Sequence, residues 1–122
     1  MRRLLVVDDS RDLLYAMKSL LGHYDFEVRT ATNSKTFQKE IASFNPEIII
    51  IDVILFGENG RDICKSFGEN PENNNVIVFL FSASPNHLKD FEECGADGII
   101  EKPFGIKELV EKINNIAKSR RA

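Results

Sequence analysis

The sequence has few of the residues that build disulfide frameworks or zinc sites. It has two cysteines, Cys64 and Cys94, which lie far apart and form no CxxC motif. This favours reduced, buried thiols that behave as small hydrophobic side chains. The two histidines, His23 and His87, show no ligand spacing with the cysteines, which argues against a metal site of that kind.

Long apolar runs and a strong net charge are also missing. No stretch approaches the ~18 residues of a membrane-spanning helix, and Asp8 and Asp9 interrupt the apolar run near Met1, unlike a signal peptide. The net charge of -3 gives no electrostatic reason to expect nucleic acid as a partner. We therefore expect a cytoplasmic protein without a membrane segment. The start at Met1 and the short tail favour a complete, one-domain protein spanning residues 1–122.

What the sequence does contain is a regular alternation of apolar runs and amphipathic segments. The runs are rich in Val, Ile and Leu, as in strands covered on both faces of a parallel sheet. The five predicted strands cover residues 4–7, 26–31, 48–51, 76–81 and 98–100. Apolar residues at three- and four-residue spacing predict helices between them. The five predicted helices have their apolar positions within residues 13–21, 37–44, 63–67, 88–94 and 106–117.

Such alternation predicts a doubly wound α/β fold with right-handed crossovers. For five strands we expect the flavodoxin-like parallel sheet, with strand order 2-1-3-4-5 and five flanking helices. Ligands of these sheets bind at the carboxyl edge of the strands, near the point between strands one and three where the order reverses.

Polar residues that could take part in catalysis or binding lie at the ends of four of the five predicted strands. Asp8 and Asp9 follow the first strand, and Asp52 ends the third. Ser82 ends the fourth, and Lys102 comes just after the fifth. Each residue alone has an ordinary explanation as a helix cap, turn former or solvated charge. Because the strands are parallel, however, all five should meet at one edge of the sheet, which favours a functional site.

The residue types at this edge suit phosphoryl transfer. Three neighbouring carboxylates repel one another, and a hard divalent cation such as magnesium (Mg2+) relieves that repulsion. The ammonium of Lys102 and the hydroxyl of Ser82 would stabilise charge on a transferring phosphoryl group. Asp52 is the best candidate for a carboxylate nucleophile because it stands on a central strand.

The ordered motifs resemble a known family. They are Asp8-Asp9, Asp52 with Gly60 eight residues on, Ser82-Ala83, and Lys102-Pro103-Phe104. In this order and spacing they resemble the receiver domain of two-component response regulators, over essentially the whole chain. The resemblance implies a phosphorylation-controlled signalling switch that catalyses only its own phosphorylation and dephosphorylation. It implies that a histidine kinase or a phosphotransferase protein donates the phosphoryl group from a histidine.

The resemblance also implies roles for individual residues. Asp52 would be the phosphoacceptor, with Ser82 and Lys102 engaging the phosphoryl group. Mg2+ or manganese (Mn2+) would be bound by Asp9, Asp52 and the backbone carbonyl of Ile54, with Asp8 acting through water.

The implied switch elements are Ser82, residue 99 and the peptide bond before Pro103, which the family has in the cis form. The family usually has an aromatic residue at position 99, and this chain has Ile99. We expect output to an unknown downstream protein through the fourth helix, the fifth strand and the last helix. We expect the chain itself to be a monomer or a weak dimer.

Two other functions are compatible with parts of this pattern. A metal-dependent phosphatase that forms an aspartyl phosphate would have a second acid two residues after the nucleophile, where this chain has Ile54. A flavodoxin-like electron carrier would have a Ser/Thr/Gly-rich phosphate loop after the first strand. Asp8 and Asp9 stand there instead and would repel phosphate without a metal.

Overall fold

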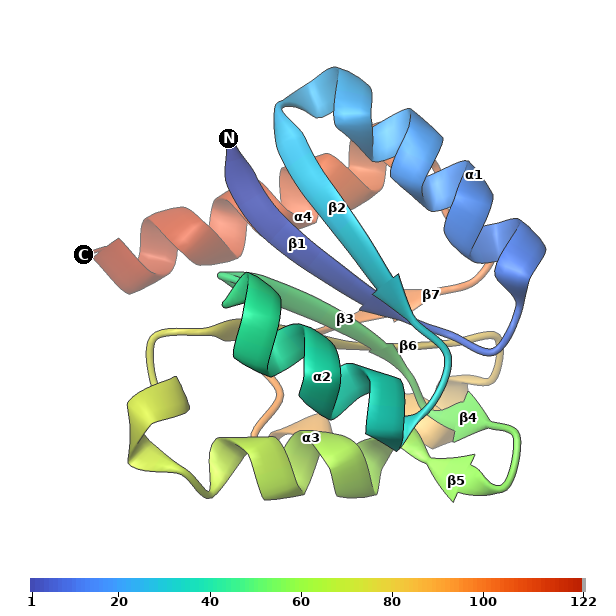
Figure 1. The fold of residues 1–122 in the computed structure, drawn as a ribbon, viewed down its shortest axis with the longest axis vertical. Helices are drawn as coiled ribbons and strands as arrows, with labels where there is room; N and C mark the ends of the chain where they lie inside the picture. The colour runs from blue at the N-terminus through green and yellow to red at the C-terminus, as the bar shows by residue number, and fades with distance from the viewer. Residues whose placement is uncertain (122) are drawn as a thin grey trace.

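The computed structural model describes residues 1–121 and has a central parallel sheet with helices on both faces (Figure 1). The strands of this sheet are β1 (Arg2–Val7), β2 (Phe26–Ala31), β3 (Ile48–Asp52), β6 (Ile77–Ser82) and β7 (Gly98–Glu101). Their order is β2-β1-β3-β6-β7, and every neighbouring pair is parallel. Counted along the chain, this is the predicted order 2-1-3-4-5. Side chains at the carboxyl ends of these strands therefore share one edge, as expected.

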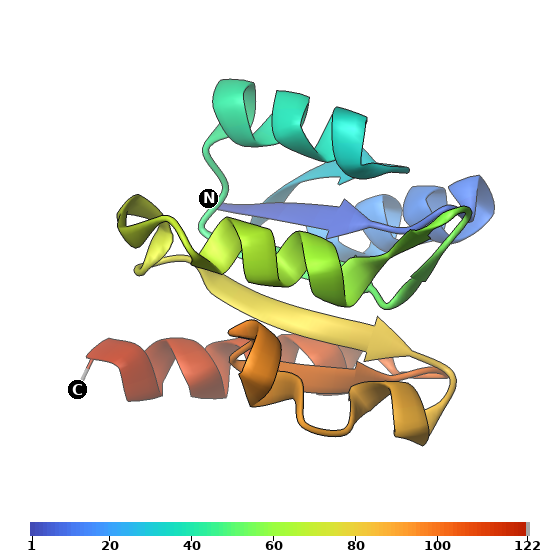
Figure 2. The ribbon, with the colours of Figure 1, turned by 90° about the horizontal axis from the view of Figure 1, so that it is seen from below.

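The helices cover the two faces of the sheet in pairs. The α-helices are α1 (Arg11–Leu21), α2 (Ser34–Phe44), α3 (Gly60–Gly68) and α4 (Ile106–Arg121). Polar caps fix where the first two begin: the Ser10 side chain accepts the Leu13 N–H, and the Asn33 side chain accepts the Thr36 N–H. Figure 2 shows the layers, with the sheet between the helices.

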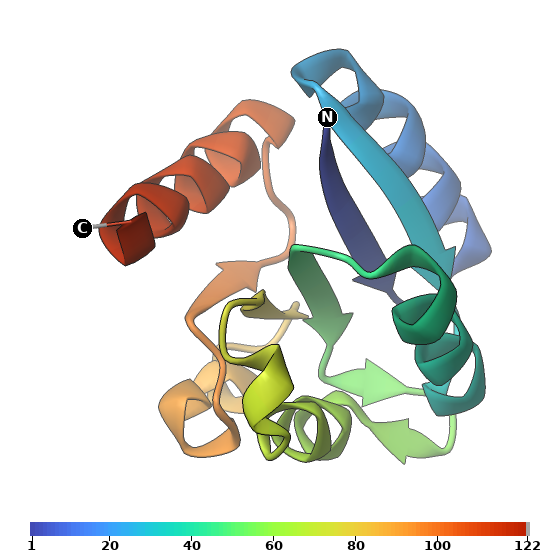
Figure 3. The same ribbon diagram turned by 60° about the vertical axis from the view of Figure 1, so that its left-hand side comes forward.

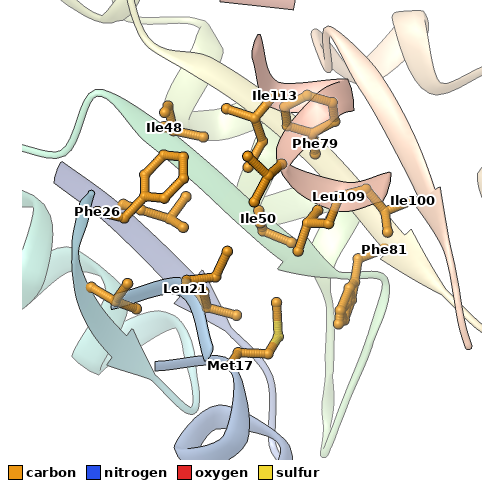
Figure 4. Close-up of a cluster of buried hydrophobic side chains, with 14 of the residues drawn as sticks. Met17, Leu21, Phe26, Ile48, Ile50, Phe79, Phe81, Ile100, Leu109 and Ile113 are labelled. Carbon is orange, nitrogen blue, oxygen red and sulfur yellow. The ribbon is translucent and has the colours of Figure 1, made fainter. Parts of the chain in front are cut away.

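Two hydrophobic clusters, one on each face, hold the sheet in place. All five residues of β3 are buried, and its side chains alternate between the clusters. Ile48 and Ile50 face α1 and α4, where they pack with Met17, Leu109 and Ile113 (Figure 4). Ile49 and Ile51 face α2 and α3. Asp52, the last residue of β3, is thus carried by a fully buried strand at the centre of the sheet.

The predicted fourth helix is wrong. Residues 85–94 form two short 3₁₀ turns, η3 (Pro85–Leu88) and η4 (Phe91–Cys94), so the described chain has four α-helices. The helix is interrupted because Lys89 is extended and Asp90 is left-handed, with φ of 53°. The Arg61 guanidinium instead donates hydrogen bonds to the carbonyls of His87, Lys89 and Asp90. Carbonyls that a helix would pair internally are therefore satisfied from α3.

A small hairpin beside the carboxyl edge was not predicted. It consists of β4 (Ile54–Leu55) and β5 (Glu58–Asn59), and it lies between β3 and α3 in the chain (Figure 3). Glu58 accepts hydrogen bonds from the hydroxyl and the backbone N–H of Ser34, which lower the pKa of that carboxyl. The hairpin is thereby tied to the start of α2. Two of its apolar side chains, Ile54 and Phe56, point to solvent.

The cysteine prediction is confirmed. Cys64 and Cys94 are both reduced and buried, and the Cys64 thiol donates to the Cys94 carbonyl at 3.2 Å. Burial raises the pKa of Cys64, which keeps the thiol protonated and unreactive. Within residues 1–121 no helix is both long enough and apolar enough to span a bilayer.

Candidate functional site

Lys102 joins two aspartates at the carboxyl edge of the sheet. Its Nζ lies 2.9 Å from Oδ2 of Asp8 and 2.7 Å from Oδ2 of Asp52. Asp8 follows β1, Asp52 ends β3 and Lys102 follows β7, so three strands bring these groups together. The two carboxylates are buried, whereas the Lys102 side chain is 24% exposed. The partly exposed ammonium thus lies at the surface of the site, and the two carboxylates lie beneath it.

Backbone hydrogen bonds fix the other oxygen of each carboxylate. Oδ1 of Asp8 accepts the Ser10 N–H at 2.8 Å, and Oδ1 of Asp52 accepts the Ile54 N–H at 2.9 Å. The backbone after Asp52 is held as well, because the Gly60 N–H donates to the Val53 carbonyl at 2.8 Å. Both carboxylates are therefore oriented before any ligand arrives.

Burial and pairing act in opposite directions on these charges. Burial raises the pKa of Asp8, and the neighbouring Asp52 adds to the rise, against the hydrogen bonds from Ser10 and Lys102. Burial lowers the pKa of Lys102, but its hydrogen bonds and charge interactions with Asp52 and Asp8 outweigh this, so that pKa is raised. The charged form of Lys102 is thus stabilised by its two partners, whereas the charged form of Asp8 is destabilised by burial.

The chain around Lys102 is also held in place. Its ammonium lies 4.4 Å from the ring centroid of Phe81, a cation–π contact. The Phe81 ring in turn packs against Phe104, with centroids 5.3 Å apart. The Lys102–Pro103 peptide bond is cis, as the resemblance implied.

Ser82 lies at the same edge but has different partners. It follows Phe81, which is the register partner of Asp52 on the neighbouring strand. Its side chain is buried, and Oγ accepts the Ser84 N–H at 3.1 Å. Oγ also lies 3.4 Å from Nδ1 of His87, a residue that sequence reasoning did not connect with the site. A histidine five residues beyond a strand-ending serine gives no recognisable sequence signal.

The remaining predicted residues lie nearer the surface. Asp9 is exposed, Ile54 is 55% exposed and Ile99 is half-buried. Within residues 1–121 no three His, Cys, Asp or Glu side chains form a group that could by itself hold a metal. The predicted cluster of three carboxylates is thus observed for Asp8 and Asp52 only, with Lys102 between them.

The donor chemistry still fits a small hard cation. Asp8 and Asp52 are buried carboxylates, and the pKa of Asp8 is raised mainly by burial, with a further contribution from Asp52. Asp9 places a third carboxylate next in the chain, open to solvent. Mg2+ prefers one or two carboxylates and keeps several waters, which such a half-open acidic site can provide.

Replacement of Asp8 by asparagine should stabilise the metal-free fold at neutral pH, by about 1 kcal/mol. A carboxyl whose pKa is raised on folding favours the folded state while it is protonated, at low pH. That contribution is lost as the pH rises through the raised pKa. The stability of wild type should therefore fall relative to Asp8→Asn between acid and neutral pH. Urea unfolding in chelator across this range measures the difference, and a constant offset at every pH would contradict the expectation.

Comparison with known proteins agrees with this geometry. The model of the response regulator receiver domain matches residues 4–114. Histidine kinase P4 of Formosa agariphila is 34% identical over 119 residues, covering 96% of this chain and 9% of that protein. Sensory transduction protein BceR of Halalkalibacterium halodurans is 29% identical over 117 residues, covering 95% of this chain and 50% of that protein. The chain therefore spans half or less of these two relatives.

Solved structures of the same kind share the fold. The response regulator TrrA of Thermotoga maritima, crystallised in complex with Mg(2+)-BeF, superimposes with a TM-score of 0.84 at 27% identity. The match covers 95% of this chain and 99% of that one.

Proposed function

This chain belongs to the response regulator receiver domain family, and from that premise we propose that Asp52 is its phosphoacceptor. The family acts as a phosphorylation-controlled switch in two-component signalling and is not a conventional enzyme. One observation carries the assignment to Asp52: this carboxylate ends the central, fully buried strand and is contacted by Lys102 at 2.7 Å. Asp8 is less suited as nucleophile because it is only 1% exposed.

The transfer proposed is a direct displacement at phosphorus. A carboxylate oxygen of Asp52 forms the new P–O bond, and the P–N bond to the donor histidine breaks as the imidazole leaves with its electron pair. The Ile54 N–H keeps the acceptor carboxylate oriented. The Lys102 ammonium exchanges its contact with Asp52 for a phosphoryl oxygen, and Ser82 donates its hydroxyl to another. In self-catalysed dephosphorylation a water oxygen forms the new P–O bond, the bond between phosphorus and Asp52 breaks, and the carboxylate and inorganic phosphate are released.

We propose Asp9, Asp52 and the backbone carbonyl of Ile54 as ligands of a divalent cation, Mg2+ or Mn2+, with Asp8 acting through water. Support comes from the acidic donor set and from the relative TrrA, whose structure contains Mg(2+)-BeF. A bound cation would supply the positive charge that offsets the approach of a phosphoryl group to three acids. Lys102 alone carries one charge and already faces two carboxylates.

We further propose that the donor is a histidine kinase or a phosphotransferase protein, and that signalling proceeds through a downstream protein in the cytoplasm, where kinases draw on ATP. The phosphatase alternative finds less support. It would use an acid two residues after the nucleophile, and that position holds Ile54, which has no group that can transfer a proton.

Labelling with acetyl phosphate tests this function without a cognate kinase. Intact mass spectrometry of wild type in millimolar Mg2+ should show the addition of one phosphoryl group, and the added mass should disappear in chelator. Urea-unfolded protein under the same conditions is the control for nonspecific modification. Equal labelling of folded and unfolded protein, or no labelling in Mg2+, would contradict the proposed function.

A further inference from the structure

The Ser82 hydroxyl has a partner outside the acidic site. Its Oγ lies 3.4 Å from Nδ1 of His87 and accepts the Ser84 N–H at 3.1 Å. A hydroxyl has one hydrogen to donate. Because Ser82 is 2% exposed, solvent does not compete for that hydrogen. The Ser84 N–H occupies one of the two acceptor positions of this oxygen. In the His87 tautomer whose Nδ1 carries no hydrogen, the Ser82 hydroxyl donates its hydrogen to that nitrogen, and we take this tautomer as part of the inference.

The segment that contains His87 is also held by the Arg61 side chain and by the buried Leu88. The Arg61 guanidinium donates to the carbonyls of His87 at 3.3 Å, Lys89 at 2.8 Å and Asp90 at 2.9 Å. Arg61 stands in the first turn of α3, directly after Gly60, which packs against the backbone of Asp52. Residues 87–90 are therefore attached to the site at two points: through Arg61 and through the hydroxyl of Ser82.

Ser82 lies at the same edge of the sheet as the acceptor carboxylate and also contacts His87. It extends β6 one residue beyond the register partner of Asp52, at the edge where the acceptor carboxylate lies. Its Oγ is also within hydrogen-bonding distance of His87. Ile99, on the neighbouring strand, has an apolar side chain that cannot take the hydrogen from either.

We propose that His87 and a phosphoryl group on Asp52 compete for the single hydroxyl hydrogen of Ser82, so that phosphorylation releases the imidazole and loosens residues 85–90. This inference rests on the proposed function, because it takes Asp52 as the acceptor. His87 is then a residue that stabilises the unphosphorylated state. It touches neither the phosphoryl group nor the cation, and it acts only through Ser82.

Removal of the competitor should strengthen binding of a phosphoryl mimic. In Mg2+, His87→Ala should bind beryllofluoride about two- to ten-fold more tightly than wild type, the range that one neutral hydrogen bond accounts for. In a Ser82→Ala background the same substitution should change the affinity less than two-fold, since no hydroxyl is left to compete for. His23→Ala, at the chain's other histidine in η1 (Gly22–Tyr24), is the matched control and should leave affinity unchanged.

Nitrogen NMR of the two imidazoles provides a second readout that does not depend on affinity. In free wild type, Nδ1 of His87 should be unprotonated and hydrogen-bonded, and its resonance should shift when beryllofluoride and Mg2+ are added. The resonances of His23 should stay in place.

The outcomes separate the inference from the function on which it rests. If wild type binds beryllofluoride but His87→Ala binds it equally or more weakly, the competition is overturned and the receiver function stands. The same holds if the gain persists without Ser82, or if the His87 resonance does not move. If wild type does not bind beryllofluoride at all, the proposed function and the inference both fail.

Discussion

Gly60→Ala is expected to destabilise the fold by about 3 kcal/mol, at the upper end of what overpacking typically costs. A Cβ at Gly60 would lie 1.9 Å from the carbonyl oxygen of Asp52 and 2.9 Å from Cγ2 of Ile51. The closest of these atoms belongs to backbone and cannot rotate away. Either α3 must shift or the peptide of Asp52 must move, and both also disturb the acceptor carboxylate. A small domain has a total stability of about 5–15 kcal/mol, so this is a large share of it.

Urea unfolding of Gly60→Ala and Gly68→Ala measures this effect against a matched control. Gly68 ends the same helix, and a Cβ there would meet nothing within 4 Å. We expect Gly68→Ala to be neutral or slightly stabilising, because alanine is favoured in helices. Gly60→Ala should also be labelled poorly by acetyl phosphate. Similar unfolding midpoints for the two variants would contradict this prediction, because the backbone of Asp52 would then move at little cost in free energy.

Lys102→Ala is expected to cost about 2 kcal/mol in the absence of divalent cation. It leaves the buried carboxylates of Asp8 and Asp52 facing each other without the ammonium that both contact. Removing one partner of a fully buried ion pair costs roughly 3–5 kcal/mol. We expect less here because the Lys102 side chain is 24% exposed.

Mg2+ should stabilise Lys102→Ala more than it stabilises wild type. In wild type a cation must share the carboxylates with the ammonium, whereas in the variant it meets them unpaired, so binding to the folded state is tighter. Thermal melts in chelator and in millimolar Mg2+ compare the two. Lys107→Ala, which removes the same charge from an exposed position on α4, should behave as wild type does. A smaller effect of Mg2+ on Lys102→Ala than on wild type would contradict this picture of the site.

The sheet could be predicted from the sequence because its signal is local. Runs such as residues 48–51 are apolar without interruption and rich in β-branched residues, a pattern typical of strands covered on both faces. Once the strands are known to be parallel, the end of each run gives the edge at which Asp8, Asp52 and Ser82 lie. The predicted strand over residues 76–81 differs only slightly from the observed β6, which includes Ser82 as its last residue.

The fourth helix could not be predicted because its pattern has two solutions. Leu88, Phe91 and Cys94 repeat every three residues, which suits one face of an α-helix and also the three-residue turn of a 3₁₀ helix. The observed 3₁₀ turns bury Leu88 and Cys94. What decides between them is Arg61, whose hydrogen bonds to the 87–90 segment cross more than 25 residues of chain. The segment in which we expected the fourth helix of the output surface therefore has a different shape, with η3 beside β6 and η4 beside β7.

The side-chain contacts of the site could not be predicted from the sequence for a related reason. Lys102 lies 94 residues from Asp8 and 50 from Asp52 along the chain, and the strand pattern fixes only the edge they share. It does not fix which carboxylates turn inward. Asp8 is buried and Asp9 is exposed, although they are neighbours with the same side chain. The pairing of Ser82 with His87 depends on the same long-range placement, through Arg61.

The most direct test of Asp52 as the cation-dependent phosphoacceptor is acetyl phosphate labelling of Asp52→Asn beside wild type. Both proteins are incubated with Mg2+, checked for native circular dichroism, and measured by intact mass and by peptide mapping. We predict one phosphoryl group on wild type, located in the peptide that contains Asp52, and none on the variant. A phosphoryl group that persists on Asp52→Asn and maps to Asp8 or Asp9 would contradict the assignment.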